Sequence, residues 1–599
     1  MLAPWRTIHP ICRYRLLVFG RLACVLLAFG LLVVLLPATS CGDRPSDLPG
    51  HPFVETVPAE EAAASPLPAD AAPPERQVFR YFSNEPSSLD VSVALYESLG
   101  SAFLFERLCM VDENETLIPG AADRWERSPD GRTWTFHLHP GARWSDGTPV
   151  TAHDFEYTFK RLLHPDSGNV YAFFYYDIKG ARAYNQRKAV DPDLIGVRAI
   201  DDLTLEIETE EPCAYLPYVT SYTASSPVPR WQVEKYGARW TEAGRCVSNS
   251  AFRLDEWVQG KYMTFRLNPH YKGNNPGHLR KIVRLFSGTA GTGSASGGVG
   301  LLPYENDEAD LVGVGSPADL DRIRNDPELS EQLWKFNGVS TVYLFFRTRE
   351  PPLNDVRVRR AIARSIDKQA IADVLFKGAV RPAYGMRPPN FPGYVGEKLR
   401  PLQQFDPETA RRLLAEAGYP GGRGFPALEV WLRDAPPSSQ SGQAVQMIQE
   451  QLLDILGIWL EIRNMKGNAF NRLMYEWEIP IGMVGYGADF SDPQSLLGVP
   501  WRSQPRGFTR HDWNNARYND LIDRARRETD RDRRMRLYEE AEWILTSEVG
   551  GAFLWHNHRF QLRKPWLKGL KRDRAGFYPF WENNTVYTEM YIGRERLDG

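Results

Sequence analysis

The sequence predicts an α/β protein made of more than one lobe. The chain has 599 residues, and a single hydrophobic core stops growing at about 250–300 residues, so two or three lobes are expected. In the second half, helical apolar stripes end at glycines and lead into alternating strands, the order that builds a lobe around a central sheet. Hydrophobic residues make up 42% of the chain and charged residues 25%, as in soluble globular proteins.

The charges of the chain nearly cancel. It contains 72 lysines and arginines against 75 aspartates and glutamates, a formal net charge of -3. This balance gives no basis for a nucleic acid or a strongly anionic surface as partner. The function therefore has to be read from individual sites.

The first forty residues are typical of an export signal, in which basic residues precede the apolar run 16–36. The following Ala38-Thr39-Ser40-Cys41 is similar to the bacterial lipobox, although Ala38 stands where leucine is usual. The similarity implies cleavage before Cys41 and lipidation of that cysteine. The alternative is an uncleaved transmembrane anchor, in which Arg21 would cost about 2.5–3.5 kcal/mol if central. Both interpretations place the rest of the chain in the periplasm or at the cell surface.

Residues 42–75 contain eight prolines and seven alanines and almost no large apolar side chain. Such a segment cannot bury enough surface to offset its ordering entropy, so a disordered tether is expected.

Three cysteines follow the tether. In an oxidising compartment we expect Cys213 and Cys246 to form a disulfide, which the chain-entropy model values at on the order of 3–4 kcal/mol. Cys109 lies in an apolar stretch and is predicted to be a small buried residue. Because none of them has CxxC spacing or a neighbouring histidine cluster, neither a metal nor a cofactor is expected.

In the first half, residues 132–139 alternate apolar and polar side chains, which predicts a half-buried strand. Asp146-Gly147 predicts a turn, and Thr151 with Asp154 resembles a capping box that opens a helix. Trp144 and Asp146 are therefore interpreted as packing and turn residues.

In the second half, helices are predicted from Asn354 to Gly378, from Asp406 to Gly418, and on the stripe that ends at Gly457. A strand is expected over 458–462, and another helix over 535–546 before the apolar residues 552–555.

Two segments invite functional interpretations that we do not favour. The glycine-rich segment 287–300 lacks the Gly-Lys-Ser/Thr of a phosphate loop and is predicted to be a mobile loop. His556 and His558 would share one face of a strand, but no third metal ligand is visible in the sequence, so an aromatic-rich strand is the better interpretation.

The stretch GYGADFSDP, residues 485–493, contains two carboxylates, Asp489 and Asp492. They could act as the acid and base of a hydrolase, bind a ligand or cap a turn. A glycosidase would need the two carboxyls about 5–10 Å apart across a bond. Asp492-Pro493 is typical of a turn, which argues against catalysis.

This stretch and several others resemble the family 5 extracellular solute-binding proteins, especially the oligopeptide-binding receptors of bacterial ABC importers. The motifs that carry the resemblance are NEPSSLD (84–90), PGAADRWERSPDGRTWTFHLHPGARWSDGTPVTAHDF (119–155), AIDDLTLEI (199–207), SSPVPRWQVEKYGARWT (225–241), NDVRVRRAIARSIDKQAI (354–371) and ARRLLAEAGYP (410–420).

The resemblance implies a two-lobed periplasmic-binding-protein-like fold of type II, with two crossing strands and an extra domain inserted in lobe I. The lobes would close over the ligand by hinge motion. With the signal (1–40) and the tether (41–75), the expected division is lobe I at 76–105, 231–339 and 558–599, the inserted domain at 106–230, and lobe II at 340–557.

The resemblance also implies the site. Asp489 matches the aspartate that receives the ligand's α-ammonium group, and the Gly485-Tyr486-Gly487 backbone matches positions that pair with a peptide. Asn249, in a motif where Ser250 replaces the usual glycine, and Tyr171 match further ligand-site residues. We expect a monomeric, non-enzymatic receptor that is anchored in the membrane by lipid, binds oligopeptides and delivers them to ABC permease subunits.

Two departures from the family pattern bear on the ligand. Met483 stands where some tripeptide and tetrapeptide receptors place an arginine for the ligand's carboxyl end. Ser340 and Gly487 stand where such receptors can carry a disulfide. Because a fold does not fix its ligand, a non-peptide solute such as a nickel complex or a glycan remains the alternative.

Overall fold

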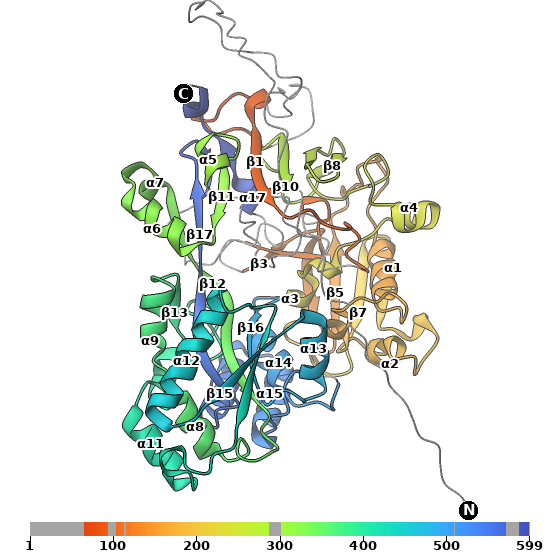
Figure 1. Ribbon diagram of the computed structural model, residues 1–599. Coiled ribbons are helices and arrows are strands. Elements are labelled where there is room, and N and C mark those ends of the chain that lie inside the picture. Colours follow the sequence, from red (N-terminus) through yellow and green to blue (C-terminus); the bar gives the residue numbers. More distant parts are fainter. Residues whose placement is uncertain are drawn as a thin grey trace, which may run out of the picture. The chain divides into compact units, whose positions relative to one another are not determined.

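The computed structural model describes residues 65–93, 103–112, 116–286, 301–507, 509–570 and 586–597 (Figure 1). The chain divides into residues 1–54 and residues 55–599, and every described residue belongs to the second part. Across the described ranges, every helix is too short or too polar to cross a membrane. The predicted export signal, Cys41 and the glycine-rich segment 287–300 lie outside the described residues.

The described part of the predicted tether is not disordered. Ser65 donates a backbone hydrogen bond to Gly277, and Ala72 donates one to Ile592. The side chain of Ala72 is fully buried. The prediction that disorder extends to residue 75 is therefore wrong for residues 65–75. Backbone hydrogen bonds to distant segments hold these residues in place.

An 11-stranded sheet dominates the described chain, and two long antiparallel strands lie at its centre. These are β12 (Leu333–Phe346) and β17 (Gly551–Arg563), which run side by side in Figure 1. On one side the sheet continues through β16, β14 and β15, and on the other through β11, β1, β10, β9 and β8. The pair β12 and β17 thus joins two groups of strands, as the crossing strands of the predicted fold should. The other strands of this sheet are β1 (Val78–Ser83), β8 (Phe252–Val258), β9 (Tyr262–Leu267), β10 (Lys281–Phe286), β11 (Leu311–Val314), β13 (Val380–Pro382), β14 (Leu428–Arg433), β15 (Leu460–Met465) and β16 (Ile481–Gly487).

A separate four-stranded sheet has the order β4-β5-β7-β6. In β5 (Thr133–Leu138), Trp134, Phe136 and Leu138 are buried and alternate with half-buried residues, which confirms the predicted strand. Helix α1 (Ala152–Leu162) packs beside this sheet and begins with the predicted capping box, in which the Thr151 amide donates to Asp154. The remaining strands are β4 (Ala122–Arg127), β6 (Val197–Asp201) and β7 (Thr204–Glu208), and two small pairs, β2 (Cys109–Val111) with β3 (Leu117–Pro119) and β18 (Leu567–Lys568) with β19 (Tyr591–Ile592).

Two of the predicted helices of the second half are confirmed with their caps. Helix α11 (Pro407–Glu416) begins after Asp406, whose side chain accepts from the Thr409 amide. Helix α12 (Gln440–Leu456) ends at Gly457, whose φ of 69° suits a residue without a side chain. The other helices are α2 (Ala181–Asn185), α3 (Leu216–Thr220), α4 (Arg230–Tyr236), α5 (Leu302–Glu305), α6 (Pro317–Asn325), α7 (Pro327–Gln332), α10 (Gly396–Gln403), α13 (Gly467–Tyr475), α14 (Val499–Trp501), α15 (Ala516–Arg527), α16 (Arg531–Ser547) and α17 (Val586–Glu589).

The long helix predicted from Asn354 to Gly378 is broken. Helix α8 (Val356–Arg364) ends at Ser365, whose hydroxyl donates to the Ala361 carbonyl. Asp367 then caps a new turn, α9 (Lys368–Ala370), by accepting from the Ala370 amide. The apolar pattern runs across this break because both pieces contribute residues to the same apolar cluster, so local caps rather than the pattern set the boundary.

The sheet around β12 is buried on both faces. Leu344, Phe346 and Trp555 belong to one apolar cluster with helices α8, α11 and α12. Tyr343 and Phe345 belong to another cluster with helices α13, α15 and α16. Burial on both faces fixes the register of β12 and β16, and this register in turn positions the segment that follows β16.

Candidate ligand-binding site

Strand β16 has one edge that is only partly covered. Along its whole length it pairs with β12, from Phe346 opposite Ile481 to Ser340 opposite Gly487. On its other edge β14 reaches only Ile481 and Gly482. Residues 483–487 therefore have no strand partner on that edge among the described residues, and Gly485 is exposed. An edge of this kind can accept an extended peptide as an added strand.

Asp489 lies just beyond this edge and is half-buried. The segment is positioned by the Ala488 amide, which donates to Val339. The Asp489 amide donates to the Ser495 hydroxyl. Two tyrosine hydroxyls donate to the carboxylate, Tyr486 at 2.9 Å and Tyr222 at 3.5 Å. A carboxylate at an open strand edge can bind a cationic group such as a ligand ammonium.

Burial raises the pKa of Asp489 to about 6, and the hydrogen bond from Tyr486, the charge of Arg510 and the hydrogen bond from Tyr222 partly oppose this rise. The guanidinium of Arg510 lies over the Tyr486 ring, 4.6 Å from its centroid. One tyrosine thus contacts both charged groups, bonding Asp489 through its hydroxyl and Arg510 through its ring.

An aromatic cluster surrounds the carboxylate. The predicted site residue Tyr171 is buried, and its ring lies 5.2 Å from that of Tyr222. Phe490, the residue after Asp489, packs against Phe174 at 5.6 Å and stacks on Tyr215 at 6.0 Å. The structure therefore brings Tyr171 and Asp489 together through Tyr222, although they come from distant parts of the sequence.

Asn249 has a different environment. Its side chain is buried and bonds both backbone groups of Glu106, accepting from the amide at 2.9 Å and donating to the carbonyl at 2.9 Å. These bonds hold the segment before β2 in place. The structure gives Asn249 this positioning role and no hydrogen bond to Asp489 or its tyrosines.

The second carboxylate of the motif is part of the scaffold. Asp492 forms a buried ion pair with Arg534 of helix α16, and their side chains are 3% and 7% exposed. It also accepts from the Gln494 amide, as the predicted turn requires. The two carboxylates thus have separate partners and separate roles.

Sequence reasoning missed Tyr222 and Arg510. Tyr222 stands just before the motif at 225–241, but nothing in its neighbours marks it as a site residue. Arg510 lies in an irregular segment with no periodicity to interpret. Only the three-dimensional structure places either beside Asp489.

The predicted disulfide between Cys213 and Cys246 is wrong: both residues, and Cys109, are free cysteines. The Cys213 carbonyl accepts from the Trp134 indole at 2.9 Å, and its thiol lies near Asp177. The thiol of Cys246 lies near Asp90 instead. Cys213 is buried and Cys246 is half-buried, and burial raises the pKa of each thiol to about 12.

No group of three potential metal ligands occurs among the described side chains. His556, on β17, is buried and bonds the Thr341 hydroxyl at 2.8 Å. Burial lowers its pKa to about 3, and that of His558 to about 4. Both are therefore neutral histidines of the sheet.

Met483 and the pair Ser340 and Gly487 are the positions at which the sequence departs from the family pattern. Met483 is buried in the apolar cluster on one face of the sheet and brings no charge to the strand edge. A Cβ built on Gly487 would lie 3.5 Å from the Ser340 Cβ, within the usual range for a disulfide. The pair is correctly placed for that bond but lacks the sulfur atoms.

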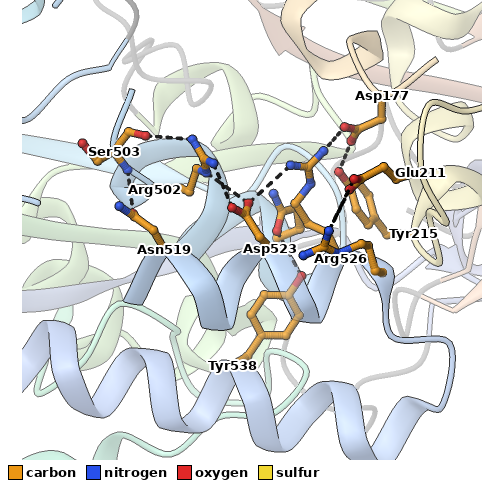
Figure 2. Close-up of polar contacts among 11 residues, drawn as sticks. Asp177, Glu211, Tyr215, Arg502, Ser503, Asn519, Asp523, Arg526 and Tyr538 are labelled. Atoms are coloured by element: carbon orange, nitrogen blue, oxygen red, sulfur yellow. Dashed lines mark hydrogen bonds and ion pairs between the residues drawn. The ribbon is translucent and has the colours of Figure 1, made fainter. Parts of the chain in front are cut away.

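A second polar cluster joins helix α15 to the segments around Asp177 and Glu211 (Figure 2). Arg526 forms an ion pair with Asp177, which also accepts a hydrogen bond from the Tyr215 hydroxyl. The neighbouring Arg527 pairs with Glu211 at 3.3 Å. These contacts lie beside the Phe490 and Tyr215 stack and hold the same two parts of the chain together.

The fold and this site define a class. Two crossing strands join two groups of strands, as in a two-lobed solute-binding protein, and a half-buried carboxylate follows an open strand edge beside them. The chain belongs to the bacterial extracellular solute-binding proteins, family 5, whose model matches residues 116–508. This family consists of the substrate receptors of ABC importers, so the protein is a receptor and not an enzyme.

Curated relatives and solved structures agree with this assignment. The periplasmic oligopeptide-binding protein OppA of Escherichia coli is 29% identical to this chain, over 89% of this chain and 95% of the length of OppA. The probable deoxycholate-binding periplasmic protein YgiS of the same organism is 28% identical over 90% of this chain and 98% of its own. The structure of the E. coli murein tripeptide binding protein MppA has a TM-score of 0.68 and 27% identity, and covers 88% of this chain and 100% of its own.

Proposed function

We propose that this protein is a lipid-anchored receptor that binds oligopeptides between its two lobes and delivers them to the permease of an ABC importer. The observation that carries the proposal is the position of Asp489 beside the partly covered edge of β16. The edge offers backbone groups to an extended peptide, and the carboxylate offers a counter-charge to its amino end. The names of the relatives OppA and MppA support a peptide as the ligand.

Burial of Asp489 favours the binding of a cation by its carboxylate. An ionised carboxylate that is partly removed from water is destabilised until an opposite charge approaches it. Burial accordingly raises the pKa of Asp489 to about 6. An α-ammonium group restores the balance, and the Tyr222 and Tyr486 hydroxyls hold the carboxylate in place for it.

The remaining site residues have supporting roles in this proposal. Gly485 and Gly487 leave room for a peptide backbone because they carry no side chain. Tyr486 and Tyr171 line the aromatic side of the site. Asn249 acts indirectly, by holding the segment at Glu106. Cys41 would carry the lipid and fix the receptor at the outer face of a membrane.

The experiment is a melting-temperature measurement on the purified protein with a pool of tripeptides to pentapeptides. Binding should raise the Tm by mass action, and Asp489→Asn should abolish the rise. Asp520→Asn is the matched control, because Asp520 is an exposed carboxylate whose partner is Arg524 on the same helix. Absence of a shift with every peptide would refute peptide binding.

The lipid anchor is tested separately. Cells that express the wild type should contain the protein in the membrane fraction, with a lipid mass on residue 41. Cys41→Ala should release the protein, or leave it uncleaved. An unmodified wild-type Cys41 in a membrane-bound, uncleaved chain would show that residues 16–36 are an anchor instead.

A non-peptide solute is the second candidate, because the relative YgiS is described as deoxycholate-binding. Mass spectrometry of whatever copurifies with the protein distinguishes the two. Peptide masses support the first candidate, whereas a bile acid or another non-peptide mass supports the second.

A further inference from the structure

Arg510 is a half-buried cation in the immediate surroundings of Asp489. Its guanidinium stacks on the Tyr486 ring at 4.6 Å from the centroid, and the hydroxyl of that ring donates to Asp489 at 2.9 Å. One tyrosine ring therefore separates the guanidinium from the carboxylate. Tyr343, Tyr475 and His511 also interact with Arg510. Among the described residues, no aspartate or glutamate forms an ion pair with it.

A cation in this position is unfavourable for a receptor that only binds an ammonium group. The positive charge that stabilises the ionised Asp489 also repels an incoming ammonium group. The same cation becomes favourable if the ligand also brings a carboxylate close to its ammonium. The guanidinium can then form a charge-assisted hydrogen bond with that carboxylate, while Asp489 binds the ammonium.

The described residues of the open edge, 483–487, include no cation. Met483 is uncharged and buried in the apolar cluster of one face of the sheet. The buried Arg534 is already paired with Asp492. Arg510 thus stacks on a residue of the open edge, and no acidic side chain in the described part of the chain forms an ion pair with it.

We propose that Arg510 determines specificity by binding a ligand carboxylate that lies within one residue of the ligand's free ammonium group. This inference rests on the proposed function, because it takes Asp489 as the ammonium acceptor. The carboxylate has two possible sources, the acidic side chain of a first residue or the terminal carboxylate of a dipeptide. In both cases a short flexible chain separates the ammonium and the carboxylate of the ligand. In the site, the Tyr486 ring separates Asp489 from Arg510 in the same way.

The test compares affinities by titration calorimetry for Glu-Ala-Ala, Ala-Ala-Ala and Lys-Ala-Ala, and for Ala-Ala and its amide. The wild type should prefer Glu-Ala-Ala over Ala-Ala-Ala, or Ala-Ala over its amide, by about tenfold or more. Arg510→Gln should remove that preference and leave Ala-Ala-Ala bound equally or more tightly. The pair of ligands between which Arg510→Gln no longer discriminates identifies the source of the carboxylate.

Three further variants complete the test. Arg510→Lys keeps the charge and should retain part of the preference, and ligand-free melting curves check that each variant is folded. Arg506→Gln is the matched control, because Arg506 pairs with Glu476 and Glu478 on the exposed surface. Asp489→Asn should abolish binding of every peptide.

The outcomes separate the two proposals. If Arg510→Gln leaves the preferences intact, or weakens all the peptides equally, the role of Arg510 is refuted while peptide binding stands. If Asp489→Asn leaves every affinity unchanged, the proposed function itself fails.

Discussion

Arg526, in the last turn of helix α15, forms an ion pair with Asp177, which lies 349 residues earlier in the chain. The two side chains are 28% and 20% exposed, so water screens the pair only in part. Arg527 and Glu211 repeat the contact at 3.3 Å. In a receptor that opens and closes by hinge motion, bonds of this kind across two distant parts of the chain favour the state in which those parts touch.

We therefore predict that Arg526→Gln weakens ligand binding by about threefold to fivefold, because the closed state loses one partly exposed ion pair. Calorimetry at low and high salt checks this, and the difference from wild type should shrink as salt rises. Arg524→Gln is the control on the same helix, since its partner is the exposed Asp520.

A double variant sharpens the result. Asp177→Asn combined with Arg526→Gln should lose no more affinity than the single variants, because both remove the same interaction. Additive losses, or an equal loss in Arg524→Gln, would contradict a contact that couples the two parts of the chain.

The two carboxylates of the GYGADFSDP stretch should have opposite effects on stability. Removing the charge of Asp492 leaves Arg534 buried without its partner, so Asp492→Asn should lower the free energy of unfolding by about 3–5 kcal/mol. Asp489→Asn removes a charge that burial already disfavours, so it should leave the free energy of unfolding unchanged or raise it. Urea unfolding of the ligand-free variants at pH 7 measures both.

Each of these variants is the control for the other, since they lie three positions apart and make the same chemical change. Equal destabilisation would show that Asp489 also serves the scaffold. A stable Asp492→Asn variant would show that the ion pair with Arg534 contributes little.

Ligand binding should depend on pH through Asp489. Burial raises its pKa to about 6, above its ordinary value, so the folded state holds this proton more tightly than the unfolded chain does. The ionised carboxyl therefore destabilises the empty receptor above pH 6, and this penalty disappears as the pH falls from 6 towards 4. An ammonium ligand needs the ionised form, so its binding must displace the proton below pH 6.

We expect peptide affinity to be level between pH 7.5 and 6.5 and to fall by up to about tenfold per pH unit below 6. Calorimetry at several pH values, in buffers of different ionisation enthalpy, should also detect uptake of the displaced proton by the buffer. Asp489→Asn tests the assignment, because any residual binding by it should lack this pH dependence. Affinity that rises on acidification would exclude Asp489 as the ammonium acceptor.

Much of the local structure follows from neighbouring residues. The capping box at Thr151 and Asp154, the cap at Asp406 and the left-handed Gly457 were predicted with their positions. Each depends on hydrogen bonds or steric limits within a few residues, which a single sequence displays directly. The break at Ser365 was missed because residues on both sides of it belong to the same apolar cluster, so the apolar pattern does not mark it.

Pairing of distant residues was predicted less well. The cysteines at 213 and 246 are free, and their thiols lie beside different segments, one near Asp177 and the other near Asp90. Residues 65–75 are ordered because backbone groups of Gly277 and Ile592 bind them. Local composition carries no information about either contact.

The sequence by itself determined the α/β elements, their caps and the glycine-flanked Asp489 at the end of a strand, because periodicity, capping and turn chemistry act over short distances. Only the tertiary structure determined the roles of the charged residues. Tyr222 donates a hydrogen bond to Asp489 from 267 residues away in the sequence. The ion pair with Arg534 makes Asp492 part of the scaffold, and Arg510 stacks on the Tyr486 ring beside Asp489. A carboxylate's chemistry is set by its burial and its partners, and these exist only once the distant segments have packed together.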